Sequence, residues 1–141
     1  MRILILLAVT LLTACEPMGM FPGNQLSGEP AEHPDDWSTL NEAEVIQIGT
    51  YDNYSVNLWG VGLSRGYYIA SARGKESRWA QRLAKNPKVT LRIDGMLYTG
   101  IAVTVTDEAE LAETKTAFES KYDLEPDEDF PEALVFRIES E

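Results

Sequence analysis

The stretch KVTLRIDGMLYTGIAVTVT, residues 88–106, decides the fold of this chain. Its residues at positions 89, 91 and 93 are apolar and alternate with polar ones, the period-two pattern of a half-buried strand. The pair Asp94-Gly95 follows and favours a type I′ turn, because both central positions of that turn need positive φ. The partner strand runs from Met96 to Thr106 and alternates in the same way. The stretch therefore predicts an antiparallel β-hairpin.

The flanking sequence predicts four more strands and two helices. The strands are expected over residues 45–51, 54–61, 67–71 and 134–138. One helix spans residues 76–85, and Asn86-Pro87 ends it because a residue before proline avoids the helical region. Asp107 and Glu110 form an acidic capping box that opens a second helix, which reaches Tyr122. This order indicates a mostly antiparallel α+β domain shaped as a small closed barrel.

The N-terminus has the layout of an export signal. Arg2 precedes a short apolar run over residues 3–12, too short to span a bilayer. The next residues complete Leu12-Thr13-Ala14-Cys15, which resembles a bacterial lipobox, whereas the alternative is an ordinary signal peptide with a chance cysteine. The resemblance implies a signal peptide over residues 1–14 and fatty acyl chains, palmitate among them, on Cys15. It places the protein in the bacterial cell envelope, anchored to the inner or outer membrane and facing the periplasm or the exterior.

Residues 15–36 are rich in Pro, Gly, Asn and Ser, and this composition predicts a flexible tether. Met18, Met20 and Phe21 are its apolar exceptions and would rest on the membrane or on the domain. Residues 37–141 are enough for one compact domain and not for two.

Composition excludes several classes of function. The net charge is −11, and removal of residues 1–14 with Arg2 makes it one unit more negative. Nucleic acid and anionic lipid are therefore poor partners. A lipidated Cys15 leaves no thiol for a disulfide or a nucleophile. His33 is the single histidine, which excludes a histidine-rich zinc site and a histidine-based dyad within the domain.

Several short motifs resemble the flavin-binding split-barrel superfamily, which includes pyridoxamine-phosphate-oxidase-like proteins and deazaflavin-dependent nitroreductases. They are YYIASARG at residues 67–74, Trp79, NPKV at residues 86–89 and Lys121-Tyr122. The resemblance covers roughly residues 37–138. It implies a six-stranded split β-barrel with two helices, an FMN or deazaflavin coenzyme and a homodimer.

The segment between the third strand and the first helix is a candidate phosphate seat. Amides at a helix N-terminus favour an anion, and Gly74 allows close approach of the backbone. Arg73 and Lys75 add two cations, and Ser71 and Ser77 add hydroxyl donors. The resemblance implies that these four side chains hold the flavin phosphate. The alternative is that both cations are solvated loop charges and that Ser77 only caps the helix.

Aromatic side chains are candidates for contact with the flavin ring. Trp79 would flank the ring or, at helical spacing with Leu83, pack into the core. Five further candidates are Tyr54, Trp59, Tyr67, Tyr68 and Tyr98, most of which we expect to be packing residues. We assign a catalytic role to none of these aromatic residues.

Two functions from different classes stay open at this point. A flavin protein needs no protein nucleophile, because the cofactor carries the redox chemistry. A non-catalytic envelope module would explain why only Asp52-Asn53 stands where deazaflavin reductases carry a longer connection.

A third reading is metal binding by Asp123, Glu125, Asp127, Glu128 and Asp129. It is disfavoured because Pro126 interrupts the run and the glycine of a calcium loop is missing. We therefore expect an acidic surface loop and no metal.

Overall fold

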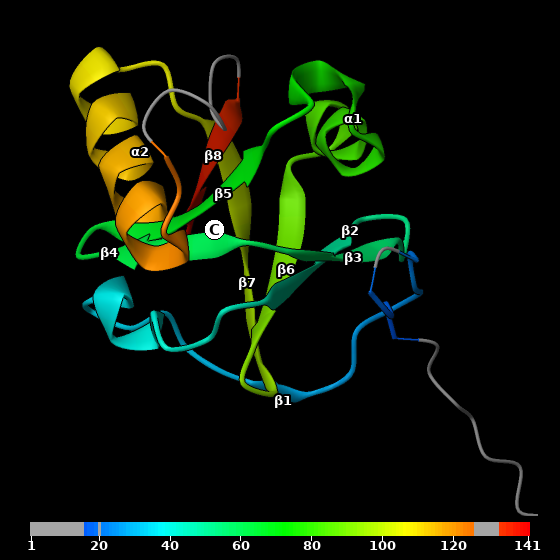
Figure 1. Ribbon diagram of the computed structural model, residues 1–141. Helices are drawn as coiled ribbons and strands as arrows, with labels where there is room; N and C mark the ends of the chain where they lie inside the picture. The colour runs from blue at the N-terminus through cyan, green and yellow to red at the C-terminus, as the bar shows by residue number, and fades with distance from the viewer. Residues whose placement is uncertain (1–15, 20, 126–132) are drawn as a thin grey trace, which may run out of the picture.

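The computed structural model describes residues 16–19, 21–125 and 133–141, which form one curled antiparallel sheet with two helices (Figure 1). The strands are β1 (Glu29–Pro30), β2 (Ile46–Thr50), β3 (Ser55–Leu58), β4 (Gly60–Leu63), β5 (Gly66–Ser71), β6 (Lys88–Ile93), β7 (Met96–Thr104) and β8 (Leu134–Glu139). The helices are α1 (Arg78–Lys85) and α2 (Glu108–Tyr122), with short 3₁₀ helices η1 (Trp37–Leu40) and η2 (Gly74–Glu76). The α+β class is confirmed.

The hairpin at residues 88–106 lies in the middle of the sheet, whose order is β3-β2-β6-β7-β8-β5-β4. Ile93 faces Met96 across the turn, and Asp94 and Gly95 both have positive φ, at 50° and 80°. That backbone is what the Asp-Gly pair favours. The predicted hairpin is therefore confirmed, with its second strand ending at Thr104.

The strand predicted over residues 54–61 is divided at Trp59, which makes seven strands along the sheet rather than six. Its first half, β3, lies at one edge of the sheet and its second half, β4, at the other. Gly60 permits the crossing, because a Cβ there would lie 2.4 Å from the Tyr67 ring. No described pairing joins β3 to β4, so the expected closed barrel is corrected to a split one.

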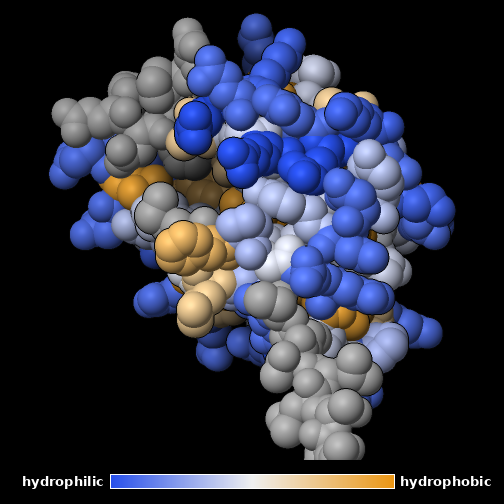
Figure 2. Space-filling view, turned by 90° about the vertical axis from the view of Figure 1, so that its right-hand side faces the viewer, coloured by the Kyte–Doolittle hydropathy of each residue, from blue (hydrophilic) through white to orange (hydrophobic). Residues whose placement is uncertain are grey.

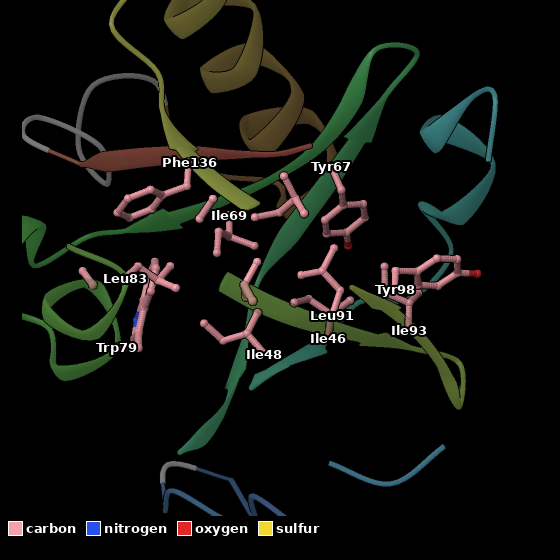
Figure 3. Close-up of a cluster of buried hydrophobic side chains, with 14 of the residues drawn as sticks. Ile46, Ile48, Tyr67, Ile69, Trp79, Leu83, Leu91, Ile93, Tyr98 and Phe136 are labelled. Atoms are coloured by element: carbon pink, nitrogen blue, oxygen red, sulfur yellow. The ribbon is translucent and has the colours of Figure 1, made fainter. Parts of the chain in front are cut away.

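Neighbouring residues on β5 point to opposite faces and enter two separate cores. Tyr67 belongs to the larger cluster, which α1 covers with Trp79 and Leu83 (Figure 3). Tyr68 belongs to a smaller cluster beneath α2, together with Phe118. The period-two geometry of a strand thus places one helix against each face of β5.

The segment expected to be a flexible tether lies along the barrel for much of its length. β1 pairs in parallel with β7, Gly23 bridges Ser55, and Leu26 is only 8 % exposed. Figure 1 shows β1 beside the turn of the β6–β7 hairpin. Backbone pairing needs no hydrophobic periodicity, which explains why the sequence pattern missed it. The ordered domain therefore begins before Trp37.

Two of the earlier expectations lie outside the described residues. They are the export signal with Cys15, and Met20. No described helix is long and apolar enough to cross a bilayer.

Candidate functional site: a cationic loop and an apolar groove beside α1

The loop between β5 and α1 has a compact shape set by two buried serines. Ser71 Oγ lies 2.9 Å from the carbonyl oxygen of Gly74, to which it donates, and 2.8 Å from Ser77 Oγ. Gly74 has a φ of +58°, the left-handed conformation that glycine adopts without strain. Both hydroxyls point into the turn, so their contact with a phosphate stays a prediction.

Helix α1 begins two residues later than predicted, after a turn of 3₁₀ helix. Ser77 is its N-cap, and Ser77 Oγ accepts a hydrogen bond from the Ala80 amide at 3.4 Å. The first turn of α1 contains Arg78 and no acidic residue. A carboxylate normally stabilises the positive end of a helix dipole, so this end is left without that compensation.

Arg73 and Lys75 are both exposed and, within the described part of the chain, neither makes an ion pair. They line a cavity of about 480 Å³ together with Glu76 and Leu134. Among the described residues of this lining, Glu76 is the one that is acidic. Within the part of the chain that the structure describes, the loop thus presents two cations without ion partners to a hollow in the surface.

A second cavity of about 780 Å³ lies beside the first, and Lys75 and Leu134 line both. Its walls are mostly apolar and come from α1, the loop after α1, β7 and β8. The apolar lining residues are Ala80, Leu83, Ala84, Pro87, Ala102, Leu134 and Phe136. Both volumes fall within the range of about 300–1,000 Å³ that is usual for ligand pockets. We call the two cavities together the α1 groove.

The α1 groove was not predicted, because its walls come from segments far apart in the sequence. Ala84 is exposed and Ala102 is buried, so neither stands out from ordinary helix and strand residues. The only signal for the groove in the sequence was the cationic loop at one end of it.

Trp79 lies in the larger core and does not line the α1 groove. Its ring packs against Phe136 with centroids 5.7 Å apart, and Figure 3 shows both at the same end of the cluster. The structure therefore brings Ser71, Arg73, Lys75 and Ser77 together and places Trp79 beneath them as a packing residue.

The five other aromatic candidates all have partners within the fold. Arg82 lies over the Tyr54 ring at 3.7 Å, and Trp59 stacks on Tyr122 with centroids 4.6 Å apart. Tyr67 and Tyr98 both pack against Trp37, and the Tyr68 hydroxyl donates to Glu110 at 2.7 Å. None of the five lines the α1 groove.

Lys121 and Tyr122 fasten α2 to the point where the sheet is split. Lys121 Nζ donates to the carbonyl oxygens of Ala43 and Gly60, both at 2.7 Å. The Tyr122 hydroxyl lies 2.7 Å from the Glu44 carbonyl oxygen and 3.0 Å from the Gly60 amide. Burial lowers the pKa of Lys121 and raises that of Tyr122. The sequence singled out this pair by resemblance alone and gave no hint of this structural role.

A second charged cluster lies under α2 and is internally satisfied. Glu110 accepts hydrogen bonds from Arg137 and Tyr68, and Arg65 lies 3.9 Å away. Burial raises the pKa of Glu110, but the bonds from Arg137 and Tyr68 outweigh it and the net pKa is lowered. With its charges paired, this cluster lacks the open cations that distinguish the α1 groove.

The acidic run weighed as a metal site is only partly described. Asp123 ends α2 in the left-handed conformation, and residues 127–129 lie outside the described part. Within the described residues, no three potential ligands gather as a metal site would require.

Comparison with known proteins finds the fold among solved structures. No family model matches the chain, and no curated protein matches it by sequence. A candidate pyridoxamine 5′-phosphate oxidase from Listeria innocua superposes with a TM-score of 0.58 at 21 % identity, covering 72 % of this chain and 87 % of that one. An FAD-binding protein from Mesorhizobium loti gives a TM-score of 0.56 at 17 % identity, with coverages of 72 % and 84 %.

A candidate 5-nitroimidazole antibiotic resistance protein from Bacteroides thetaiotaomicron gives a TM-score of 0.57 at 14 % identity, covering 70 % of this chain and 74 % of that one. At identities this low, the three superpositions establish a shared fold alone. The split-barrel fold expected from residues 67–89 and 121–122 is therefore confirmed.

Proposed function

We propose that this chain is a membrane-tethered lipoprotein whose split barrel binds a flavin nucleotide, FMN or a deazaflavin coenzyme, in the α1 groove. One observation carries the proposal: two cations without ion partners among the described residues stand at one end of an apolar groove. That pairing matches a ligand with an anionic tail and a flat apolar ring. The similarity in fold to an FAD-binding protein supports the same ligand class.

The phosphate end fits the charge of the loop. Arg73 and Lys75 flank Gly74, whose backbone a phosphate can approach closely, and the uncompensated N-terminus of α1 follows. Glu76 opposes an anion, so we expect it to turn to solvent when the phosphate is bound. The protein as a whole is acidic, so this loop supplies local attraction against an unfavourable background.

The ring end fits the apolar walls. Ala84 and Ala102 are small, which leaves width for a flat ring between α1 and the neighbouring strands β7 and β8. A flavin bound there supplies the hydride or electron chemistry. The residues of the chain bind it, orient it and exclude water. The proposal includes an oxidoreductase activity but assigns no catalytic side chain.

The cellular setting belongs to the same proposal. Cys15 would carry the acyl chains that hold the protein in the bacterial envelope, at the inner or outer membrane. The homodimer follows from the resemblance alone. The strong negative charge argues against nucleic acid as a partner.

The test is to measure FMN binding by the lipidated chain, with flavin fluorescence as the readout. The double variant Arg73→Ala, Lys75→Ala should weaken FMN binding at least about tenfold, a loss of roughly 1.4 kcal/mol. The matched control is Lys88→Ala with Lys115→Ala, which removes two cations that lie near Glu141 and Glu119 instead. Equal affinity of both double variants would remove the proposed phosphate seat.

The second candidate function is a non-catalytic envelope module that keeps the barrel without a cofactor. The tight turn at Asp52-Asn53 favours it, because Asp52 is bound to Thr50 and Arg82 and forms no wall of a flavin site. Folded protein that binds neither FMN nor a deazaflavin coenzyme would support this function instead.

A further inference from the structure

Two of the exposed large apolar side chains lie in the first described residues, and two more lie before β2 and after β3, where they line a hollow together with Gly19. They are Met18 at 76 % exposure, Phe21 at 75 %, Val45 at 55 % and Trp59 at 50 %. Met18 and Phe21 bridge one another, and Val45 and Trp59 line a hollow of about 530 Å³ with Gly19. Figure 2 shows apolar side chains gathered in a hollow on one half of the face it draws. We call these four side chains the apolar patch.

The patch is anchored to the barrel by contacts of the residues that follow Cys15. The Glu16 carboxylate lies 3.2 Å from Arg92 on β6 and accepts a hydrogen bond from Ser27 at 2.7 Å. Asn57 on β3 donates to the carbonyl oxygen of Gly19 at 3.0 Å. The chain is thus fixed to the barrel within four residues of the cysteine, in place of the long tether that the sequence suggested.

Covalent geometry turns this anchoring into a limit on distance. Cys15 is bonded directly to Glu16, and consecutive Cα atoms lie about 3.8 Å apart. Acyl chains on Cys15 must therefore enter a bilayer beside Glu16 and so beside the apolar patch. A barrel held this closely has no length of free chain on which to move away from the membrane.

We propose that the apolar patch is a membrane-docking surface that seats the barrel directly on the bilayer around the lipidated Cys15. This inference rests on the lipidation that the proposed function includes. Apolar and aromatic side chains beside an acyl anchor add buried area at the interface. The net charge is −11 for the whole sequence and one unit more negative without residues 1–14, which points to zwitterionic lipid as the occupant because an anionic surface would repel the domain.

The fluorescence of Trp59 gives a direct readout of docking. Trp37 and Trp79 are buried, at 4 % and 7 % exposure, so Trp59 is the tryptophan open to an external quencher. The lipidated chain, free of flavin, is reconstituted into phosphatidylcholine vesicles whose acyl chains are brominated near the headgroup. Bromine should quench the emission, and Trp59→Phe should remove that quenching while the protein still floats with the vesicles.

A matched pair of variants separates the patch from exposed apolar surface in general. Phe21→Ser with Val45→Ser should abolish bromine quenching of Trp59, whereas Tyr51→Ser should leave it unchanged. Tyr51 is 48 % exposed but lies at the opposite end of β2 from Val45. All four substituted side chains are exposed or partly exposed on loops and strand ends, so the fold should persist, as circular dichroism would verify.

The outcomes are distinguishable. Flotation without bromine quenching would overturn the docking surface and leave the lipoprotein intact. A chain that carries no acyl group on Cys15 and does not float would overturn both. Trp59 shielded from aqueous acrylamide but not quenched by bromine would show that a second copy of the chain covers the patch, which also overturns the proposal.

Discussion

The neighbours Tyr67 and Tyr68 show how one residue position decides the environment of a side chain. The Tyr68 hydroxyl donates to Glu110 and accepts from Arg65 at 3.0 Å. The Tyr67 hydroxyl faces the larger core and, among the described residues, has no hydrogen-bond partner. A buried hydroxyl without a partner costs about 1–3 kcal/mol.

We therefore expect Tyr67→Phe to raise the free energy of unfolding by about 1 kcal/mol at pH 7, since it removes that cost. Tyr68→Phe is the matched control and should lower it by a similar amount, because it breaks two hydrogen bonds. Urea unfolding followed by circular dichroism measures both. A destabilised Tyr67→Phe would contradict the account.

Stability should also fall at alkaline pH because of Tyr67. Burial raises its pKa far above the ordinary value near 10. Above about pH 10 the Tyr67 hydroxyl loses its proton in the unfolded chain but keeps it in the folded chain. The free energy of unfolding therefore falls as pH rises. Tyr67→Phe should make this fall shallower between about pH 9.5 and 11. If stability fell with pH equally steeply in Tyr67→Phe and in the unchanged protein, the pKa of Tyr67 would not differ between the folded and unfolded chains, and the account would be wrong.

Among the elements, α1 matters most to the α1 groove, and the segment before β2 matters most to the completeness of the sheet. α1 forms one wall of the α1 groove with its exposed Ala84, while its opposite face buries Trp79 in the core. The segment before β2 adds β1 to the sheet and buries Leu26 against Gly49. One element therefore shapes the site and the other completes the barrel.

A bulky side chain at Ala84 should block the ring end of the groove. Ala84→Trp is expected to weaken FMN binding at least about tenfold with little change in stability, because the position is exposed. Ala112→Trp, on an exposed position of α2, is the control and should bind FMN as the unchanged protein does. Full binding by Ala84→Trp would show that the ring lies elsewhere.

Truncating the buried side chain of the N-terminal segment should destabilise the whole barrel. Leu26→Ala is expected to cost about 2–3 kcal/mol, the usual penalty for a buried leucine. Met18→Ala, on an exposed side chain, should change stability by less than about 0.5 kcal/mol. A Leu26→Ala variant as stable as the parent would mean that the segment does not pack in solution.

Elements with a local signal were predictable from the sequence, and those made by distant contacts were not. The β6–β7 hairpin is encoded by alternation and the Asp94-Gly95 turn, and α2 by its capping box. The split at Trp59 depends on Gly60 meeting the Tyr67 ring, seven residues away in sequence. The groove needs four segments at once, so the sequence revealed only its cationic end.

On the scale of the whole molecule, two features of opposite character lie at different places on the barrel. The cationic loop and groove are built from η2, α1, β7 and β8, and the apolar patch from the first residues, Val45 and Trp59. Their lining residues do not overlap, so ligand binding and docking can proceed independently. In an acidic protein, a loop that presents Arg73 and Lys75 without ion partners among the described residues is arranged to receive an anion.

The most direct test of the account is a calorimetric titration of the lipidated chain with FMN and with riboflavin, which lacks the phosphate. The account predicts saturable FMN binding that weakens as salt rises, and riboflavin binding at least about tenfold weaker. No heat with either ligand, or equal affinity for both, would contradict the claim that the α1 groove holds a flavin nucleotide through its phosphate.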